Sequence, residues 1–124
     1  APVPGAVLPN PRVARRLADG SLRDAHLLDL CDLRPTLILR SDYPLAIGTP
    51  DADLQQLRVV PVQQRAEAEG SVVDHHGEVA AALALDAPSV AWLVRPDGHI
   101  AARWRHLTPG LLGPALRRLA GRCA

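Results

Sequence analysis

Residues 90–104, Val90-Ala91-Trp92-Leu93-Val94-Arg95-Pro96-Asp97-Gly98-His99-Ile100-Ala101-Ala102-Arg103-Trp104, predict a β-hairpin. Pro96 presets φ for the second position of a type I turn, and Asp97 suits the third position. Gly98 can adopt the positive φ that closes such a turn. We therefore expect one strand on each side of the segment from Arg95 to His99.

The two hairpin strands differ in pattern. The first, Val90–Val94, is apolar on both faces, which is typical of a strand covered on both sides. The second, His99–Trp104, alternates apolar and polar residues, which is typical of an edge strand. Two further strands are predicted upstream. Thr36–Arg40 has the doubly apolar pattern of a central strand. In the strand Arg58–Val62, Pro61 cannot donate a backbone hydrogen bond and is expected at a sheet edge or at the end of the strand.

Three helices are predicted between and after these strands. Thr49 and Pro50 are typical of a helix start, followed by inward-facing Leu54 and Leu57. A second helix is expected over Asp74–Leu85. The third begins at Thr108-Pro109, is expected to bend or restart at Pro114, and buries one leucine face made of Leu112, Leu116 and Leu119.

The expected order is therefore βαβαββα, which is that of a thioredoxin-like α/β fold. In that fold a central mixed four-stranded sheet has its first two strands parallel, and right-handed crossovers place helices on both faces. We assign residues 36–124 to this domain and residues 1–35 to an N-terminal extension and linker, in which Ser21 could cap a short helix carrying Leu27, Leu28 and Leu30. Fold analogy also raises the chance of a cis peptide bond before Pro88.

Composition excludes several classes of function. The 124 residues suffice for one domain with a core. Net charge is only +1, and the aromatic residues are Tyr43, Trp92 and Trp104, so we expect no nucleic-acid partner. The apolar run Val79–Leu85 is far too short to span a bilayer, so we expect no membrane partner and a soluble protein.

The reactive side chains do not form a recognisable catalytic set. Cys31 and Cys123 lack CxxC spacing, and we expect a buried apolar Cys31, an exposed terminal Cys123 and no disulfide. The cluster Asp74-His75-His76 is interpreted as a solvated helix start, because adjacent histidines point different ways and no second cluster completes a metal site. The remaining histidines, His26, His99 and His106, are scattered.

The position of the thioredoxin dithiol is also informative. Residues 41–48 contain no cysteine, which excludes disulfide exchange there. Asp42 and Tyr43 are assigned pocket-lining or capping roles, and the basic patch Arg103–His106 a partner contact or a solvated rim. Neither GxGxxG nor GxxxxGK[ST] occurs. We therefore expect no catalytic, cofactor-binding or metal-ligating residue in this chain.

The string LVRPDGHIAARW, Leu93 to Trp104, resembles a segment near the C-terminus of FAD-dependent aromatic hydroxylases. These are the phenol hydroxylase and 3-(3-hydroxyphenyl)propionate hydroxylase group, with related aromatic-polyketide hydroxylases. Gly5–Asn10 is similar to the linker that enters their thioredoxin-like domain. The absence of methionine and the start Ala1-Pro2 fit a cut within such a linker.

The resemblance implies a noncatalytic C-terminal domain that packs on a missing N-terminal catalytic body and can contribute to a homodimer. FAD and NAD(P)H belong to that body, and the whole is a cytoplasmic monooxygenase of aromatic compound catabolism. A domain separated from its catalytic body is expected to expose the apolar patch on which that body packed. Trp92 and Trp104 are the candidate residues in the neighbourhood of this patch. The alternative is an independent thioredoxin-like protein without a CxxC redox site.

Overall fold

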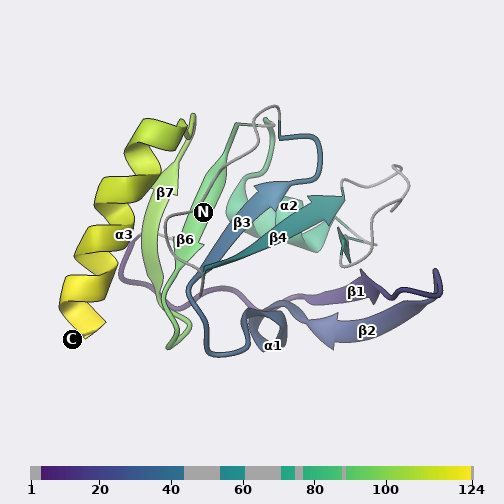
Figure 1. Ribbon diagram of the computed structural model, residues 1–124. Helices are drawn as coiled ribbons and strands as arrows, with labels where there is room; N and C mark the ends of the chain where they lie inside the picture. The colour runs from purple at the N-terminus through teal and green to yellow at the C-terminus, as the bar shows by residue number, and fades with distance from the viewer. Residues whose placement is uncertain (1–3, 44–53, 61–70, 75–76, 88, 124) are drawn as a thin grey trace.

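The computed structural model of the chain describes residues 4–43, 54–60, 71–74, 77–87 and 89–123 (Figure 1). Its strands form one seven-stranded sheet in the order β2-β1-β5-β4-β3-β6-β7. The strands are β1 (Arg12–Arg16), β2 (Leu22–His26), β3 (Thr36–Arg40), β4 (Gln55–Val60), β5 (Val72–Val73), β6 (Ala91–Val94) and β7 (Ile100–Trp104). The helices are α1 (Leu27–Cys31), α2 (Glu78–Leu83) and α3 (Pro109–Cys123).

The predicted hairpin is confirmed as β6 and β7. Its turn is closed by hydrogen bonds from the Arg95 amide to the His99 carbonyl (2.8 Å) and from the Gly98 amide to the Arg95 carbonyl (2.9 Å). The Asp97 carboxylate accepts a bond from the His99 amide (3.1 Å), and Gly98 has a φ of +86°. β7 is the last strand of the sheet, as its alternating pattern predicts.

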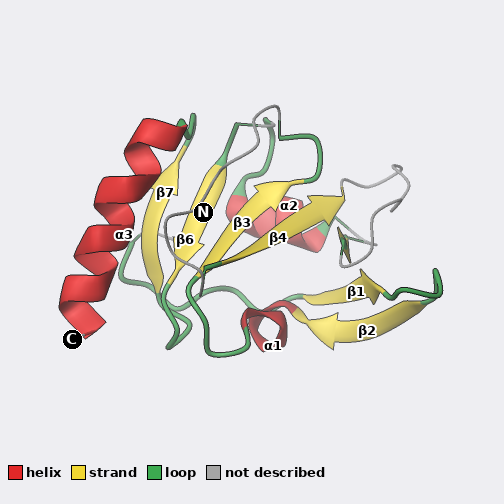
Figure 2. Cartoon of the chain, viewed as in Figure 1, coloured by secondary structure: helices red, strands yellow, loops and turns green. Residues whose placement is uncertain are grey.

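The centre of the sheet has the predicted mixed pairing. β3 runs parallel to β4 and antiparallel to β6. Alternate residues of these strands enter two separate cores, because successive side chains of a strand point to opposite faces. Ile38 and Trp92 belong to the first core, and Leu37 and Leu93 to the second. Helices α1 and α2 contribute to the first core and α3 to the second, so both faces are covered (Figure 2).

Trp92 is not part of an exposed apolar patch. Its side chain is 0% exposed, and its indole Nε1 donates a 2.8 Å hydrogen bond to the Leu83 carbonyl. Trp104 is half-buried and packs against the second core. The expectation of an exposed apolar patch is therefore wrong for Trp92, because its side chain faces α2.

The N-terminal extension adds strands that the sequence analysis did not predict. β1 and β2 form an antiparallel hairpin, and β1 pairs antiparallel with β5, so the sheet has seven strands rather than four. Val13 and Ala14 are fully buried, yet three arginines in the five residues of β1 hide the strand pattern. The short helix after β2 begins at Leu27, while Ser21 bonds to Asp19 in the hairpin turn (2.9 Å).

Two predicted helix boundaries are wrong. The helix proposed from Thr49 cannot extend to Leu57, because 55–60 form β4 and the Leu57 side chain enters the first core. Leucines three apart fit a helix face, but strand pairing with β3 overrides that local pattern. α2 is shorter than predicted, since Ala84 adopts the left-handed conformation with a φ of 50°. Residues 49–53, Pro61-Val62 and Pro88 lie outside the described residues.

α3 begins at Pro109, as predicted, and runs to Cys123 without a restart at Pro114. Leu112, Leu116 and Leu119 are buried on one face of α3 and belong to the second core. Pro114 lies inside the helix and is exposed, so its ring faces away from the sheet. The helix therefore accepts the loss of one backbone donor because its leucine face is anchored on both sides of Pro114.

Replacing Gly98 by Val is expected to destabilise the fold by about 1 kcal/mol or more. A Cβ at Gly98 would lie 2.9 Å from Leu28 Cδ1, and the positive φ strains any β-branched residue. Chemical denaturation measures this loss. The matched control is Gly110→Ala in α3, where a Cβ meets nothing within 4 Å, and its stability should not fall. Equal stability of the wild type and Gly98→Val would contradict the assigned turn.

Candidate functional site

The carboxyl end of β3, where thioredoxin-like redox proteins place their dithiol, is held by an ion pair. Arg40 binds both oxygens of Asp42, through Nε to Oδ1 (3.0 Å) and through Nη2 to Oδ2 (2.8 Å). Its Nη1 also donates to the Leu85 carbonyl at 3.3 Å. Both carboxylate oxygens of Asp42 are thus engaged in a bidentate contact that fixes the strand end.

Tyr43, the next residue, has structural contacts of the same kind. Its ring is buried, and its hydroxyl donates to the Leu107 carbonyl ahead of α3. The Arg58 guanidinium lies 5.7 Å from the ring centroid. Burial raises the pKa of Tyr43, so the phenol keeps its proton at neutral pH. The end of β3 is therefore built to join β4 and the start of α3 rather than to exchange protons.

Cys31 is a buried thiol, as predicted. It is 3% exposed and its Sγ lies 3.7 Å from the Leu27 carbonyl within α1. Burial raises the pKa of the Cys31 thiol, which disfavours the nucleophilic thiolate. The side chain of Cys123 is outside the described residues.

Asp74 acts at the start of α2. Its carboxylate is 1% exposed and accepts hydrogen bonds from the amides of Val79 (3.1 Å) and Ala80 (3.0 Å). These amides lie in the first turn, where a helix has no internal acceptors. Asp74 is therefore committed to the fold, and His75 and His76 lie outside the described residues.

The other histidines do not converge. His26 ends β2 and has Nδ1 3.9 Å from the Asp29 carboxylate, while His99 lies in the β6–β7 turn with Nδ1 3.3 Å from Asp97 Oδ1. His106 is exposed beyond β7. Within the described part of the chain, no three metal-ligating side chains come together.

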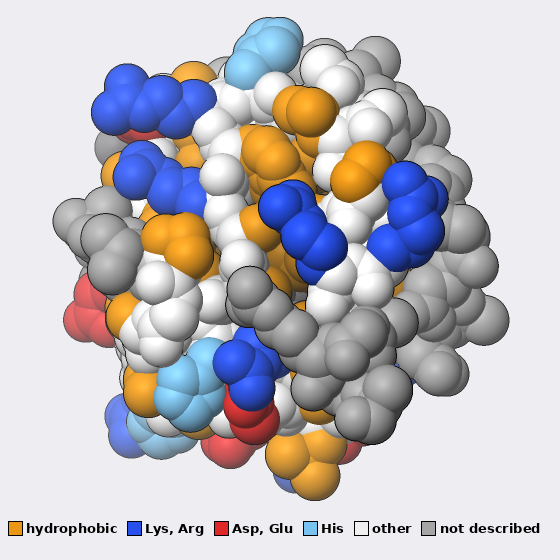
Figure 3. All heavy atoms as spheres, turned by 90° about the vertical axis from the view of Figure 1, so that its left-hand side faces the viewer, with side chains coloured by type: hydrophobic (Ala, Val, Ile, Leu, Met, Phe, Trp, Pro, Cys, Tyr) orange, Lys and Arg blue, Asp and Glu red, His pale blue; other side chains and the backbone are white. Residues whose placement is uncertain are grey.

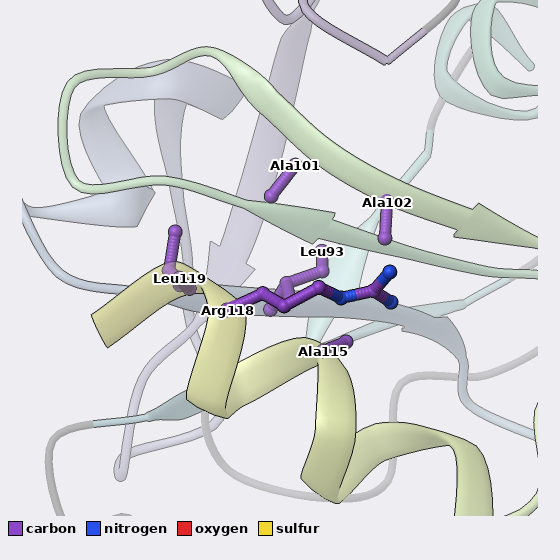
Figure 4. Close-up of a pocket in the computed structure, with 6 residues that line it drawn as sticks. All are labelled: Leu93, Ala101, Ala102, Ala115, Arg118 and Leu119. Carbon is purple, nitrogen blue, oxygen red and sulfur yellow. The ribbon is translucent and has the colours of Figure 1, made fainter. Parts of the chain in front are cut away.

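One hollow lies between α3 and the β6–β7 hairpin and has a volume of about 110 Å³. Figure 4 shows the Arg118 side chain lying along this hollow, between the helix and the strands. The wall is otherwise apolar, lined by Leu93, Ala101, Ala102, Ala115 and Leu119. Figure 3 shows the face of the molecule on the α3 side, where several arginine side chains lie beside a group of hydrophobic ones. The hollow offers a cation above an apolar floor and no nucleophile or base.

A second hollow, of about 560 Å³, lies beside the β1–β2 hairpin. Arg15 and Arg23 are directly opposite each other in this hairpin and both line the hollow. Like charges at directly opposed positions of a sheet repel each other. Asp24 and Asp29 line the same hollow, so its charges are mixed.

A third hollow, of about 200 Å³, gathers part of the basic patch that the sequence analysis identified. Arg103 on β7 and Arg105, which follows the end of that strand, both line it. Trp104 points to the other face, into the second core. Asp86, which the sequence analysis did not select, also lines the hollow, and only the tertiary structure brings it to β7.

Comparison with known proteins gives fold relatives but no sequence family. No family model matches the chain, and no curated protein sequence matches it.

Among the helices of the described residues, none has the length and apolar content to cross a membrane.

Solved structures provide the likeness. One is aklavinone-11 hydroxylase in a ternary complex with FAD and aklavinone, with a TM-score of 0.67 and 22% identity over 91% of this chain and 20% of that chain. Another is a mitochondrial 2-Cys peroxiredoxin from Plasmodium falciparum, with a TM-score of 0.61 and 9% identity over 98% of this chain and 94% of that chain. A third is a putative electron transfer protein from Aquifex aeolicus VF5, with a TM-score of 0.60 and 15% identity over 96% of this chain and 99% of that chain.

These likenesses show the fold. The central β3–β4–β6–β7 sheet with helices on both faces is thioredoxin-like α/β, as the element order predicts. The chain spans one fifth of the hydroxylase it matches but almost all of the peroxiredoxin and of the Aquifex protein.

Cys31 is expected to resist thiol reagents in the folded state, because it is buried and its pKa is raised. In a Cys123→Ser variant, the reaction with Ellman's reagent at pH 8 should be more than about tenfold slower than that of free cysteine. Denaturant should restore the full rate. Fast labelling of the native variant would show that α1 opens or that Cys31 is accessible.

Replacing Asp74 by Ala is expected to cost about 1–2 kcal/mol of unfolding free energy. The change removes the acceptor of two amides at the start of α2. The control is Glu78→Gln, an exposed acid in the same helical turn, for which a change below about 0.5 kcal/mol is expected. Urea denaturation of both variants separates the two effects, and an equal loss would refute the capping role of Asp74.

Proposed function

We propose that this chain is a noncatalytic, C-terminal domain of an FAD-dependent aromatic hydroxylase, packed on a separate catalytic body. The observation that carries the proposal is the agreement between sequence and structure. The segment Leu93–Trp104 resembles a segment of such hydroxylases, and the fold resembles one fifth of an aklavinone hydroxylase chain. The sequence segment coincides with most of the β6–β7 hairpin, and the structural likeness extends over 91% of the chain.

The side chains at the thioredoxin site support a noncatalytic role. The residue types at 41–48 include no thiol, and the described Asp42 and Tyr43 are engaged in contacts that hold the fold. Cys31, whose thiol is described by the structure, is buried, and its pKa is raised. None of these groups offers a nucleophile to a disulfide or a peroxide.

In this proposal the chain itself does not hold FAD. The sequence contains neither of the glycine-rich loops that hold a dinucleotide or phosphate at a helix start. In the proposal, FAD and NAD(P)H therefore belong to the catalytic body, whose pocket provides the shielded environment for oxygen chemistry. The proposal places the whole protein in the cytoplasm, with a homodimer contact as a second role of this domain.

An independent thioredoxin-like protein is the second candidate. It is supported by structural likenesses that cover 94% of the peroxiredoxin and 99% of the Aquifex electron transfer protein. It is disfavoured by the absence of a CxxC pair from the sequence. Fold alone does not choose between the two candidates, because thioredoxin-like folds carry unrelated functions.

Expression of the complete reading frame that encodes residues 1–124 tests the proposal. We expect a longer polypeptide with a flavin absorption spectrum. Its upstream part, expressed separately, should keep FAD and copurify with the 124-residue chain. A reading frame that encodes only a thioredoxin-like protein would reject the proposal in favour of the independent protein.

Titration of FAD into the 124-residue chain alone provides a second test. We expect flavin fluorescence to remain unchanged at micromolar protein, because the chain lacks a dinucleotide-binding loop. Riboflavin serves as the control for nonspecific quenching. Stoichiometric binding of FAD would contradict the assignment of the cofactor to another part of the protein.

A further inference from the structure

Arg103 on β7 carries a buried donor that has no acceptor. Its guanidinium Cζ lies 5.0 Å from the centroid of the Trp92 ring, and its Nε has no hydrogen-bond partner among the described residues. A buried N–H without an acceptor costs about 1–3 kcal/mol, so such groups in native proteins usually have a partner. The ring beneath the guanidinium is itself held in place, because Trp92 is fully buried and its indole donates to the Leu83 carbonyl.

The guanidinium borders the hollow of about 200 Å³ described above. Arg105 lines the same hollow two residues further along the chain, and Asp86 lines it from the segment after α2. None of these three groups has an ion-pair partner within the described part of the chain. Two cations and one anion give the hollow a formal charge of +1.

We propose that this hollow is a binding site for one carboxylate group, held side-on by Arg103 and assisted by Arg105. A guanidinium presents its Nε–H and one Nη–H in parallel, which matches the two oxygens of a carboxylate and gives the unpaired Nε an acceptor. A single negative charge balances the +1 of the lining groups, whereas a doubly charged phosphate would leave a net charge of −1 in the hollow. The proposal does not depend on the proposed function.

The rest of the lining defines the remainder of the ligand. Ala84, Ala87 and Val90 are small and apolar, so the group attached to the carboxylate is expected to be apolar and compact. A free aromatic or aliphatic acid meets this description, and so does an aspartate or glutamate side chain on a protein surface that packs against β7. The shared chemistry is the carboxylate, and the experiment below distinguishes its two sources.

Titration of benzoate into the ¹⁵N-labelled 124-residue chain, followed by the arginine Nε–H resonances, tests the site. We expect the Arg103 resonance to shift and saturate with benzoate, to remain in place with benzamide, and to respond at least tenfold more weakly to inorganic phosphate. An acetylated and amidated glutamate peptide is titrated in parallel. Tighter binding of the peptide identifies a protein side chain as the source, and tighter binding of benzoate identifies a free acid.

Variants locate the response. R103K keeps the positive charge but loses the two parallel N–H donors of the guanidinium. R105Q removes the assisting charge at an exposed position. Each variant is expected to weaken benzoate binding at least tenfold. R58K is the matched control, because Arg58 lies over an aromatic ring in the same manner but borders another core. R58K should bind benzoate as the wild type does, and D86N should bind it more tightly. Because R103K could lower stability by disturbing the Trp92 contact, R105Q provides the independent readout.

Three results would overturn the proposal. The first is an equal response to benzoate and benzamide, which would show binding by the apolar part alone. The second is unchanged benzoate affinity in folded R103K and in R105Q. The third is a shift of the Arg103 resonance in ligand-free D86N as large as benzoate causes, since Asp86 would then be the internal partner of Arg103.

Discussion

The fold depends on one constraint, which is that β3 and β6 are apolar on both faces. Four of the five residues of β3 and all four residues of β6 are buried. A strand pair of this kind excludes water only if separate layers cover both sides. α3 supplies one layer through its leucines, and α1, α2 and Val13 of β1 supply the other. The N-terminal hairpin contributes to that requirement, because Val13 of β1 is fully buried in the first core.

Trp92 connects this constraint to the surface. It is the largest of the fully buried side chains described, and it lies at the centre of the first core with its indole bonded to α2. Its ring also supports Arg103 on the neighbouring strand, to which it is directly paired. The same ring that packs in the core therefore also provides a surface on which one guanidinium rests.

Several buried and half-buried polar side chains contact the ends of secondary-structure elements. Gln55 Nε2 on β4 donates to the carbonyls of Leu30 (2.7 Å) and Cys31 (2.8 Å) at the end of α1. Asp74 accepts from the first turn of α2, and Arg40 fixes Asp42 after β3. The side chains of Gln55 and Asp74 thus form hydrogen bonds with backbone groups that would otherwise lack a partner.

The sequence by itself determined the features that depend on neighbouring residues. Pro96-Asp97-Gly98 specifies its turn because φ preferences are local, and the leucine spacing of α3 specifies its buried face. Only the tertiary structure decided the assignment of Leu57 to a strand and the pairing of β1 with β5, because both depend on partners far along the chain. The hollow at β7 is of the same kind. Arg103 and Arg105 are visible as a basic patch, but their juxtaposition with Trp92 and Asp86 follows from β-pairing and from the path of the chain after α2.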